Sequence, residues 1–371
     1  MTLLALTDLD PAFHTSFSFY ALLPGQGHQV AGAPAASEAF ERAERLLASD
    51  LVHAPESDLD GFVALLLTHG SQLLADERFR MLADETARAF ARLLGSELHR
   101  SRRMRLTRIS LMLRVILDQN VDSSGFVSAS IVPAKSPWDL LMETSSRSDG
   151  YIVSCDDDNV RSFCESQVRW SMRAGLPTQL DRLGEDVWIG SHYTRGGQIV
   201  KLAHPSRPFL LTIEHSAPLV LAFEMGTERW VLDAAGGLWL LRGTSIAHKL
   251  MQLPGIVHRA RVVGPTLYAF DWSNAGTCIA IDLPRLRADS MATGDIIVCN
   301  DVCGHDGMLY GICKLQGRVF KMTNEWKPLS TRLGAGDGPA QLLDPIMIRS
   351  EGDHLHVLNW FSGKLVKLQL F

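Results

Sequence analysis

The chain has 371 residues, of which 46% are hydrophobic and 21% are charged, a composition typical of a folded globular protein. Its formal net charge of −5 at pH 7 argues against general nucleic-acid binding, which requires a basic excess. No apolar stretch is long enough to span a bilayer, and residues 1–20 lack the basic start of a signal peptide. The six cysteines are therefore expected to be reduced thiols in a cytoplasmic protein.

Up to about residue 118, apolar residues recur every three or four positions, which predicts amphipathic helices. Ser57 and Asp60 form a capping pattern at the start of one such segment. We expect a helical N-terminal domain over residues 1–120.

The last of these helical segments is rich in arginine, with six between Arg100 and Arg114. A basic amphipathic helix binds acidic or anionic partners, which makes Arg102 and Arg105 candidate partner-binding residues. The alternative is a helix that packs against the rest of the protein with its arginines paired to acidic loops.

From about residue 125 the period of the apolar residues changes to two, and short strands are separated by Gly, Asp, Asn and Ser. Six stretches align without gaps, and each is followed by a second apolar strand: GYIVSC, VWIGSH, RWVLDA, LYAFDW, LYGICK and LHVLNW. Their second residues are Tyr151, Trp188, Trp230, Tyr268, Tyr310 and His356, at intervals of 37, 42, 38, 42 and 46 residues.

A repeat of about forty residues with several strands per unit is typical of propeller blades. The predicted fold class is α+β: a helical N-terminal domain followed by a six-bladed all-β propeller over residues 125–371. The last repeat lacks a fourth strand, so residues 125–132 are expected to supply it and close the ring. The alternative is a sandwich of two sheets, which gives no reason for a repeated aromatic column.

The segment GAGDGPAQLLDP and the strands after it resemble an NHL-type repeat. The matching residues are Gly334, Gly336, Gly338, Pro339, Pro345, Gly352, Leu355 and Asn359. The stretch CNDVCGHDGMLYGI is similar to a unit of gluconolactonase-type six-bladed propellers. That second resemblance implies that Asn300 is a ligand of a central metal ion.

Candidate ligand-binding residues are those expected at the ring centre, where the first strand of each blade begins. Asn300 and His258 stand ten residues before Tyr310 and Tyr268, and the comparable residues elsewhere are Trp138, His215 and Asp344. Asn300, His258 and Asp344 would together suit one divalent cation, such as Ca, Mn, Fe or Zn. The alternative is that these residues hydrogen-bond the strand ends around a water-filled tunnel.

Four other features are interpreted as structural. Asp301 is expected to form a turn beside Asn300, and His356 to pack in the aromatic column beside His354. Cys299 and Cys303 are expected to be small buried hydrophobes, and residues 155–159 a solvated acidic turn.

Two functions follow from these observations. In the first, the propeller is a binding module for a peptide, protein or small ligand, assisted by the helical domain. In the second, it is a metal-dependent hydrolase, lyase or tailoring enzyme with its site on the axis. The sequence contains no nucleophile or acid–base pair at a recognisable spacing, which favours the binding module.

Overall fold

The computed structural model of the chain divides into two compact units, one of residues 1–121 with 334–336 and one of residues 122–333 with 337–371. In the first unit the structure describes residues 41, 44–45, 54–55, 57–59, 62, 77–83 and 334. It describes the second unit apart from residues 135–136, 143–149, 156–157, 165–166, 203–207, 272–276, 293–298, 314–316, 337–338, 343–344 and 360–362.

The described parts of the first unit include helical residues at 57–59 and 77–83. Apolar side chains from these turns are buried, among them Leu59, Phe62 and Phe79. Arg78 Nη2 lies 2.5 Å from Glu44 Oε1. The extent of the helical domain over residues 1–120 stays a prediction, and Arg102 and Arg105 lie outside the described residues.

The described residues of the second unit form 23 strands, arranged as four four-stranded sheets and one seven-stranded sheet, all antiparallel. One four-stranded sheet comprises β2 (Asp139–Met142), β3 (Gly150–Ser154), β4 (Asn159–Cys164) and β5 (Gln167–Arg173). A second comprises β13 (Arg259–Val263), β14 (Thr266–Phe270), β15 (Thr277–Asp282) and β16 (Arg287–Ala292). A third comprises β17 (Cys299–His305), β18 (Met308–Cys313), β19 (Arg318–Met322) and β20 (Pro328–Arg332). The last comprises β21 (Pro345–Glu351), β22 (His354–Asn359), β23 (Lys364–Gln369) and β1 (Phe126–Ile131).

The seven-stranded sheet explains why four separate four-stranded sheets form where the sequence predicts six. Its strands are β6 (Gln179–Leu183), β7 (Asp186–Gly190), β8 (Arg195–Lys201), β9 (Phe209–Met225), β10 (Glu228–Asp233), β11 (Gly237–Arg242) and β12 (Ser245–Gln252). The first part of β9 pairs with β8 and its last part pairs with β10. Because no turn interrupts this strand of 17 residues, two four-stranded patterns merge into one sheet.

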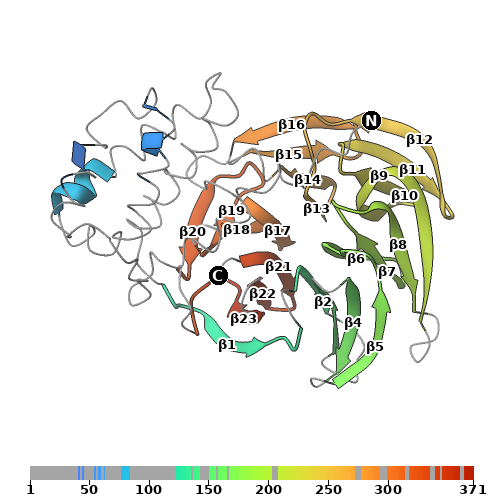
Figure 1. Cartoon of the computed structure of the whole chain (residues 1–371), viewed down its shortest axis with the longest axis horizontal. Helices are drawn as coiled ribbons and strands as arrows, with labels where there is room; N and C mark the ends of the chain where they lie inside the picture. Colours follow the sequence, from blue (N-terminus) through green and yellow to red (C-terminus); the bar gives the residue numbers. More distant parts are fainter. Residues whose placement is uncertain are drawn as a thin grey trace. The chain divides into compact units, whose positions relative to one another are not determined.

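The sheets lie side by side around a central axis, with β2, β6, β13, β17 and β21 innermost and β5, β12, β16, β20 and β1 outermost (Figure 1). This arrangement is a β-propeller. The strand expected at 125–132 is β1, which pairs antiparallel with β23 and has an irregular register at Val127. The last sheet therefore combines a strand from the start of this unit with three from its end, which closes the ring.

The aromatic column packs inside the unit. Trp188, Trp230, Tyr268 and Tyr310 are buried, as is His356. In the first sheet the column is displaced by one residue. Ile152 pairs with the third residue of β2, as Trp188 and Tyr268 pair with the third residues of their inner strands. The gap-free alignment at Tyr151 is therefore wrong by one position, and Tyr151 is only half-buried.

Candidate functional site

The residue that precedes the first paired residue of an inner strand occupies one recurring place in the ring. Trp138, Thr178 and His258 donate their backbone N–H to the carbonyls of Ser154, Gly190 and Phe270, at 3.0, 2.9 and 2.9 Å. In each case the acceptor is the last residue of the second strand. These three residues therefore lie at the edge where inner strands begin and second strands end, which we call the rim.

Asn300 is the counterpart of His258 in the sheet that begins with β17, because Asp301 after it pairs with Ile312 as Arg259 pairs with Phe270. Here the inner strand extends further back, and Cys299 pairs with Cys313. Asn300 is 4% exposed and sits at an irregularity of the register. Trp138, His258 and Asn300 therefore hold equivalent places in their sheets, and their roles as ligand-binding residues stay predictions.

The other two candidates differ. Asp344 lies outside the described residues, and in that sheet the equivalent place is held by Ile346, beside an irregularity of register before Met347. His215 is not at the rim position, which is Val220, ten residues before Trp230. Val220 is apolar, so the polar candidate His215 lies five residues before the true rim position.

His215 instead belongs to a separate polar group. Its Nε2 lies 3.3 Å from Asp233 Oδ2, and its ring meets Trp239 edge-on with 5.1 Å between centroids. Asp233 also accepts hydrogen bonds from Gly237 N and Trp239 Nε1, both at 2.7 Å. These bonds fix the turn between β10 and β11.

Five side chains at the rim form a compact group that we call the rim cluster: Trp138, His192, Tyr193, His258 and Asp271. The ring of Trp138 meets the rings of His192 and Tyr193 at 6.0 and 6.2 Å. His192 lies 3.9 Å from Tyr193 and 5.4 Å from His258 between ring centroids. His258 Nδ1 lies 3.5 Å from Asp271 Oδ1.

The loop after β7 holds two members of the rim cluster. The Ser191 hydroxyl accepts hydrogen bonds from the backbone of Tyr193 and Thr194, at 3.0 and 3.1 Å, and this turn projects both rings. Burial, with the nearby His258 and Arg259, lowers the pKa of His192 well below its usual range. His192 is therefore a neutral imidazole at pH 7. His192 and Tyr193 cannot be recognised from spacing, because their position depends on the register of β7 against β6.

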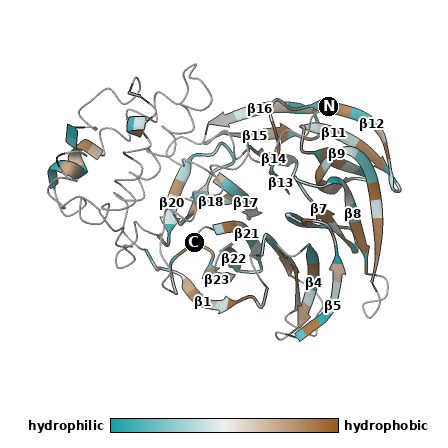
Figure 2. Cartoon of the chain, viewed as in Figure 1, coloured by the Kyte–Doolittle hydropathy of each residue, from teal (hydrophilic) through white to brown (hydrophobic). Residues whose placement is uncertain are grey.

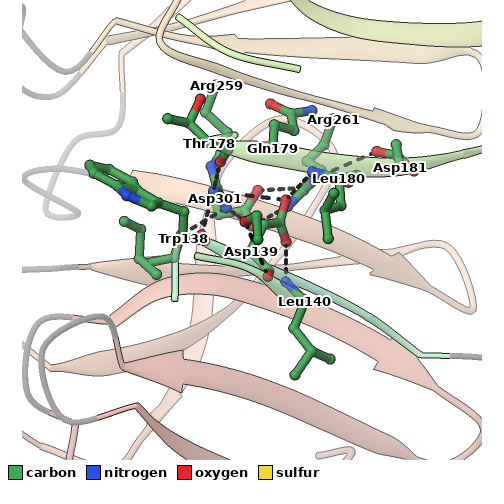
Figure 3. A network of polar contacts seen from close by, with 12 residues as sticks. Trp138, Asp139, Leu140, Thr178, Gln179, Leu180, Asp181, Arg259, Arg261 and Asp301 are labelled. Atoms are coloured by element: carbon green, nitrogen blue, oxygen red, sulfur yellow. Dashed lines mark hydrogen bonds and ion pairs between the residues drawn. The ribbon is translucent and has the colours of Figure 1, made fainter. Parts of the chain in front are cut away.

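Behind the rim cluster lies a group of three arginines and three aspartates that we call the axial network: Asp139, Asp181, Arg259, Arg261, Asp301 and Arg349. All are buried except Asp181 and Arg349, which are partly buried. Figure 3 shows the carboxylates of Asp139 and Asp301 between the guanidinium groups of Arg259 and Arg261. Arg261 binds Asp301 through Nε and Nη2, at 2.8 and 3.0 Å, and donates to Asp139 Oδ2 at 2.8 Å. Such bidentate pairs are the strongest ionic hydrogen bonds in proteins.

Arg259 connects the inner strands to one another. It donates to the carbonyls of Trp138, Thr178 and Ile346 at 2.8, 2.9 and 2.9 Å, and to Asp301 Oδ2 at 3.1 Å. Arg349 adds bonds to Asp139 and to the carbonyls of Leu140 and Leu180. All five sheets therefore contribute an inner strand to the axial network.

The electrostatics of the axial network are balanced. Burial alone would raise the pKa of the Asp139 carboxyl, but Arg261, Arg349 and Arg259 outweigh it and hold the pKa below its usual range. The three carboxylates thus offset the three guanidinium charges. Asp301 is fully buried here, so the prediction that it forms a turn is wrong. The overlooked signal is charge inside apolar inner strands, as in RARVV and IMIRS.

The remaining candidates have the following places. Cys299 is buried opposite Cys313, and burial, followed by Asp301, raises the pKa of the partly exposed Cys303 to about 12. All six cysteines are free thiols. Among the described residues, no group of three or more His, Cys, Asp or Glu side chains is arranged to hold a metal ion. In the same part of the chain no helix is long and apolar enough to cross a membrane.

No family model and no curated protein matches the sequence. Similar solved structures include a streptogramin B lyase, with a TM-score of 0.48 and 10% identity over 67% of this chain and 89% of that one. The WD40 propeller domain of Doa1 has a TM-score of 0.47 and 10% identity over 59% of this chain and 75% of that one. BamB from Moraxella catarrhalis has a TM-score of 0.39 and 12% identity over 66% of this chain and 99% of that one. Likeness at these identities does not extend to function.

Proposed function

We propose that the chain is a propeller-based binding module that recognises a peptide, protein segment or small ligand at the rim cluster. The observation that carries this proposal is the contact of Trp138, His192, Tyr193 and His258 at one end of the axis. Aromatic and imidazole rings offer apolar faces together with polar edges, which suits the recognition of planar groups.

The axial network supports binding at the rim rather than passage along the axis. Arg259 is fully buried and Arg261 is 4% exposed, and their hydrogen bonds join inner strands from every sheet. A ligand that entered further would have to break charged hydrogen bonds between buried partners, which is costly.

The test uses a panel of aromatic compounds and short peptides, screened against the full chain by ligand-observed NMR. Binders at the rim should lose affinity roughly tenfold in Tyr193→Ala, since one aromatic contact and its buried area are removed. His258→Gln should weaken the same binders.

Two control variants match these changes. Tyr151→Ala removes another half-buried tyrosine, which stacks on Phe163 at 5.4 Å. His248→Gln changes an exposed histidine on β12. Binders that respond equally to the control and the rim substitutions would contradict the proposal.

The second candidate function is a metal-dependent enzyme, and it is favoured by one observation: His258 and Asn300 hold equivalent rim positions. An imidazole nitrogen and an amide oxygen are both suitable donors for a divalent cation, and Asp344 is the third proposed ligand. Such an ion would polarise a substrate carbonyl or activate water.

Elemental analysis before and after chelator dialysis tests this second candidate. About one Ca, Mn, Fe or Zn ion per chain, lost in Asn300→Ala, would favour the enzyme. Failure to retain any of the four ions after their addition would eliminate it.

We also propose that the propeller has six blades. We count β6 to the first part of β9, and the last part of β9 to β12, as two units, which gives six. The NHL-like and gluconolactonase-like segments support this count. The free cysteines support a cytoplasmic protein, the net charge of −5 supports partners other than nucleic acid, and Arg102 and Arg105 are proposed to contact a partner.

A further inference from the structure

The outer edge of β1 is exposed along most of its length. Of its six residues, five are exposed, with Val127 at 48% and Ile131 at 66%. The strand ends the order β1-β23-β22-β21, so within the described residues no strand pairs with its other side. An edge of this kind presents backbone donors and acceptors to any further strand.

β1 also lacks the features that normally prevent such pairing, which are charged side chains and proline. The outermost strands of the other sheets have them. They are Arg169 and Arg173 in β5, Lys249 in β12, Arg287 and Asp289 in β16, and Pro328 and Arg332 in β20. The sequence of β1 is FVSASI, and Figure 2 shows no strongly hydrophilic residue along it.

The sequence of β1 is complementary to itself. The run Val127-Ser128-Ala129-Ser130-Ile131 has the same order of chemical types in both directions. In an antiparallel pair centred on Ala129, Val127 lies opposite Ile131, Ser128 lies opposite Ser130, and Ala129 lies opposite itself. Apolar and hydroxyl pairs of this kind are favourable across antiparallel strands.

We propose that β1 pairs antiparallel with β1 of a second copy of this chain, which joins two propellers edge to edge about a two-fold axis. Charge is compatible with a second copy as the partner. β1 itself contains no charged residue, and Asp122 before it is paired with Arg332 of the same chain, so antiparallel pairing about Ala129 opposes no like charges. Symmetric pairing of identical surfaces is the commonest form of homo-oligomer.

The register of β1 agrees with this use. Ser128 to Ile131 pair regularly with β23, and the irregularity is confined to Val127. Six residues from each copy would bury less accessible surface than the roughly 1,200 Å² that a stable interface requires. The dimer is therefore concentration-dependent.

The experiment measures self-association of the full chain by sedimentation velocity over a range of concentrations. Ala129→Lys should weaken the dimer about fivefold or more, because two like charges meet at the two-fold axis. Ala129→Glu should do the same. An equimolar mixture of the two variants should restore association, because Lys then faces Glu.

Ala247→Lys is the matched control, since it places the same charge on an exposed position of another outermost strand, β12. A wild-type chain that stays monomeric at every concentration would overturn the proposal. So would equal weakening by Ala247→Lys, or failure of the mixture to restore the dimer. If Ala129→Lys does not fold, Ile131→Ser replaces it, because that side chain is already 66% exposed.

Discussion

Arg259 illustrates how much one buried side chain can determine. It is fully buried and contacts four other inner strands through three carbonyls and one carboxylate. Replacement by Met leaves Asp301 and these carbonyls without their donor. We expect Arg259→Met to lower the free energy of unfolding by about 3–5 kcal/mol, measured by urea denaturation.

Two further variants separate charge from geometry at this position. Arg259→Lys keeps the charge but cannot place four hydrogen bonds in one plane, so it should recover little stability. Arg285→Met removes an exposed arginine from its pair with Asp282 and should cost less than about 1 kcal/mol. A loss for Arg259→Met no larger than that of Arg285→Met would contradict the role of the axial network.

His356 makes stability depend on pH. Burial, with Lys367 and His354 nearby, lowers its pKa to about 4 from an ordinary value of 6.5. The unfolded chain therefore takes up this proton at a higher pH than the folded chain does. The stabilisation is present above pH 6.5 and is lost as the pH falls towards 4.

The amount lost is up to about 3 kcal/mol for this group. Denaturation curves at several pH values should show a shallower pH dependence in His356→Gln than in the wild type. His248→Gln makes the same substitution at an exposed site of β12 and serves as the control. Parallel curves for all three proteins would contradict the assignment.

At the scale of elements, Gly190 fixes the approach of β7 to β9. A Cβ at this position would lie 1.8 Å from the Val220 carbonyl oxygen and 2.9 Å from Trp188 Nε1. Trp188 Nε1 donates to the same carbonyl at 3.1 Å. Because the obstacle is backbone, Gly190→Ala should destabilise the chain by roughly 3 kcal/mol or more in thermal and urea unfolding.

Gly226→Ala is the control for this change. Gly226 has a φ of +61° and open space around it, so alanine there suffers only backbone strain of about 1 kcal/mol. Equal losses for the two variants would show that the contact with Val220 is unimportant.

The elements also show what the sequence can and cannot predict. The repeated aromatic residues predicted a propeller, and the missing fourth strand of the last repeat predicted the place of β1, whereas the expected six separate sheets were not confirmed. The continuity of β9 was not predictable, because Pro218 and the residues around it are typical of a break between strands. The ten-residue spacing was enough to place His258 and Asn300 at the rim. The rim cluster could not be predicted, because it depends on the register of β7.

The axial network was also not predictable, for a different physical reason. Each of these inner strands contributes one or two charged residues. In the sequence, a single charged residue beside an apolar run indicates a turn or an edge strand. Their partners lie up to 210 residues away, as for Arg349 and Asp139. Only the closure of the ring brings these charges together.

At the scale of the whole molecule, ring closure makes the first and last strands of the second unit interdependent. β1 pairs with β23, and Tyr310 donates its hydroxyl to the Phe371 carbonyl at 2.9 Å. We expect a fragment of residues 122–371 to fold cooperatively on its own. A fragment that begins at residue 133 lacks β1 and exposes the whole edge of β23.

The shorter fragment should lose about 3 kcal/mol, because several backbone hydrogen bonds of about 0.5–1.5 kcal/mol each are removed. This corresponds to a melting temperature lower by about 6–12 °C, measured by circular dichroism. Addition of a synthetic peptide of residues 122–134 should raise the melting temperature of the shorter fragment. Equal melting of both fragments would show that β1 does not close the ring, and the dimer proposed at its outer edge would then lack its foundation.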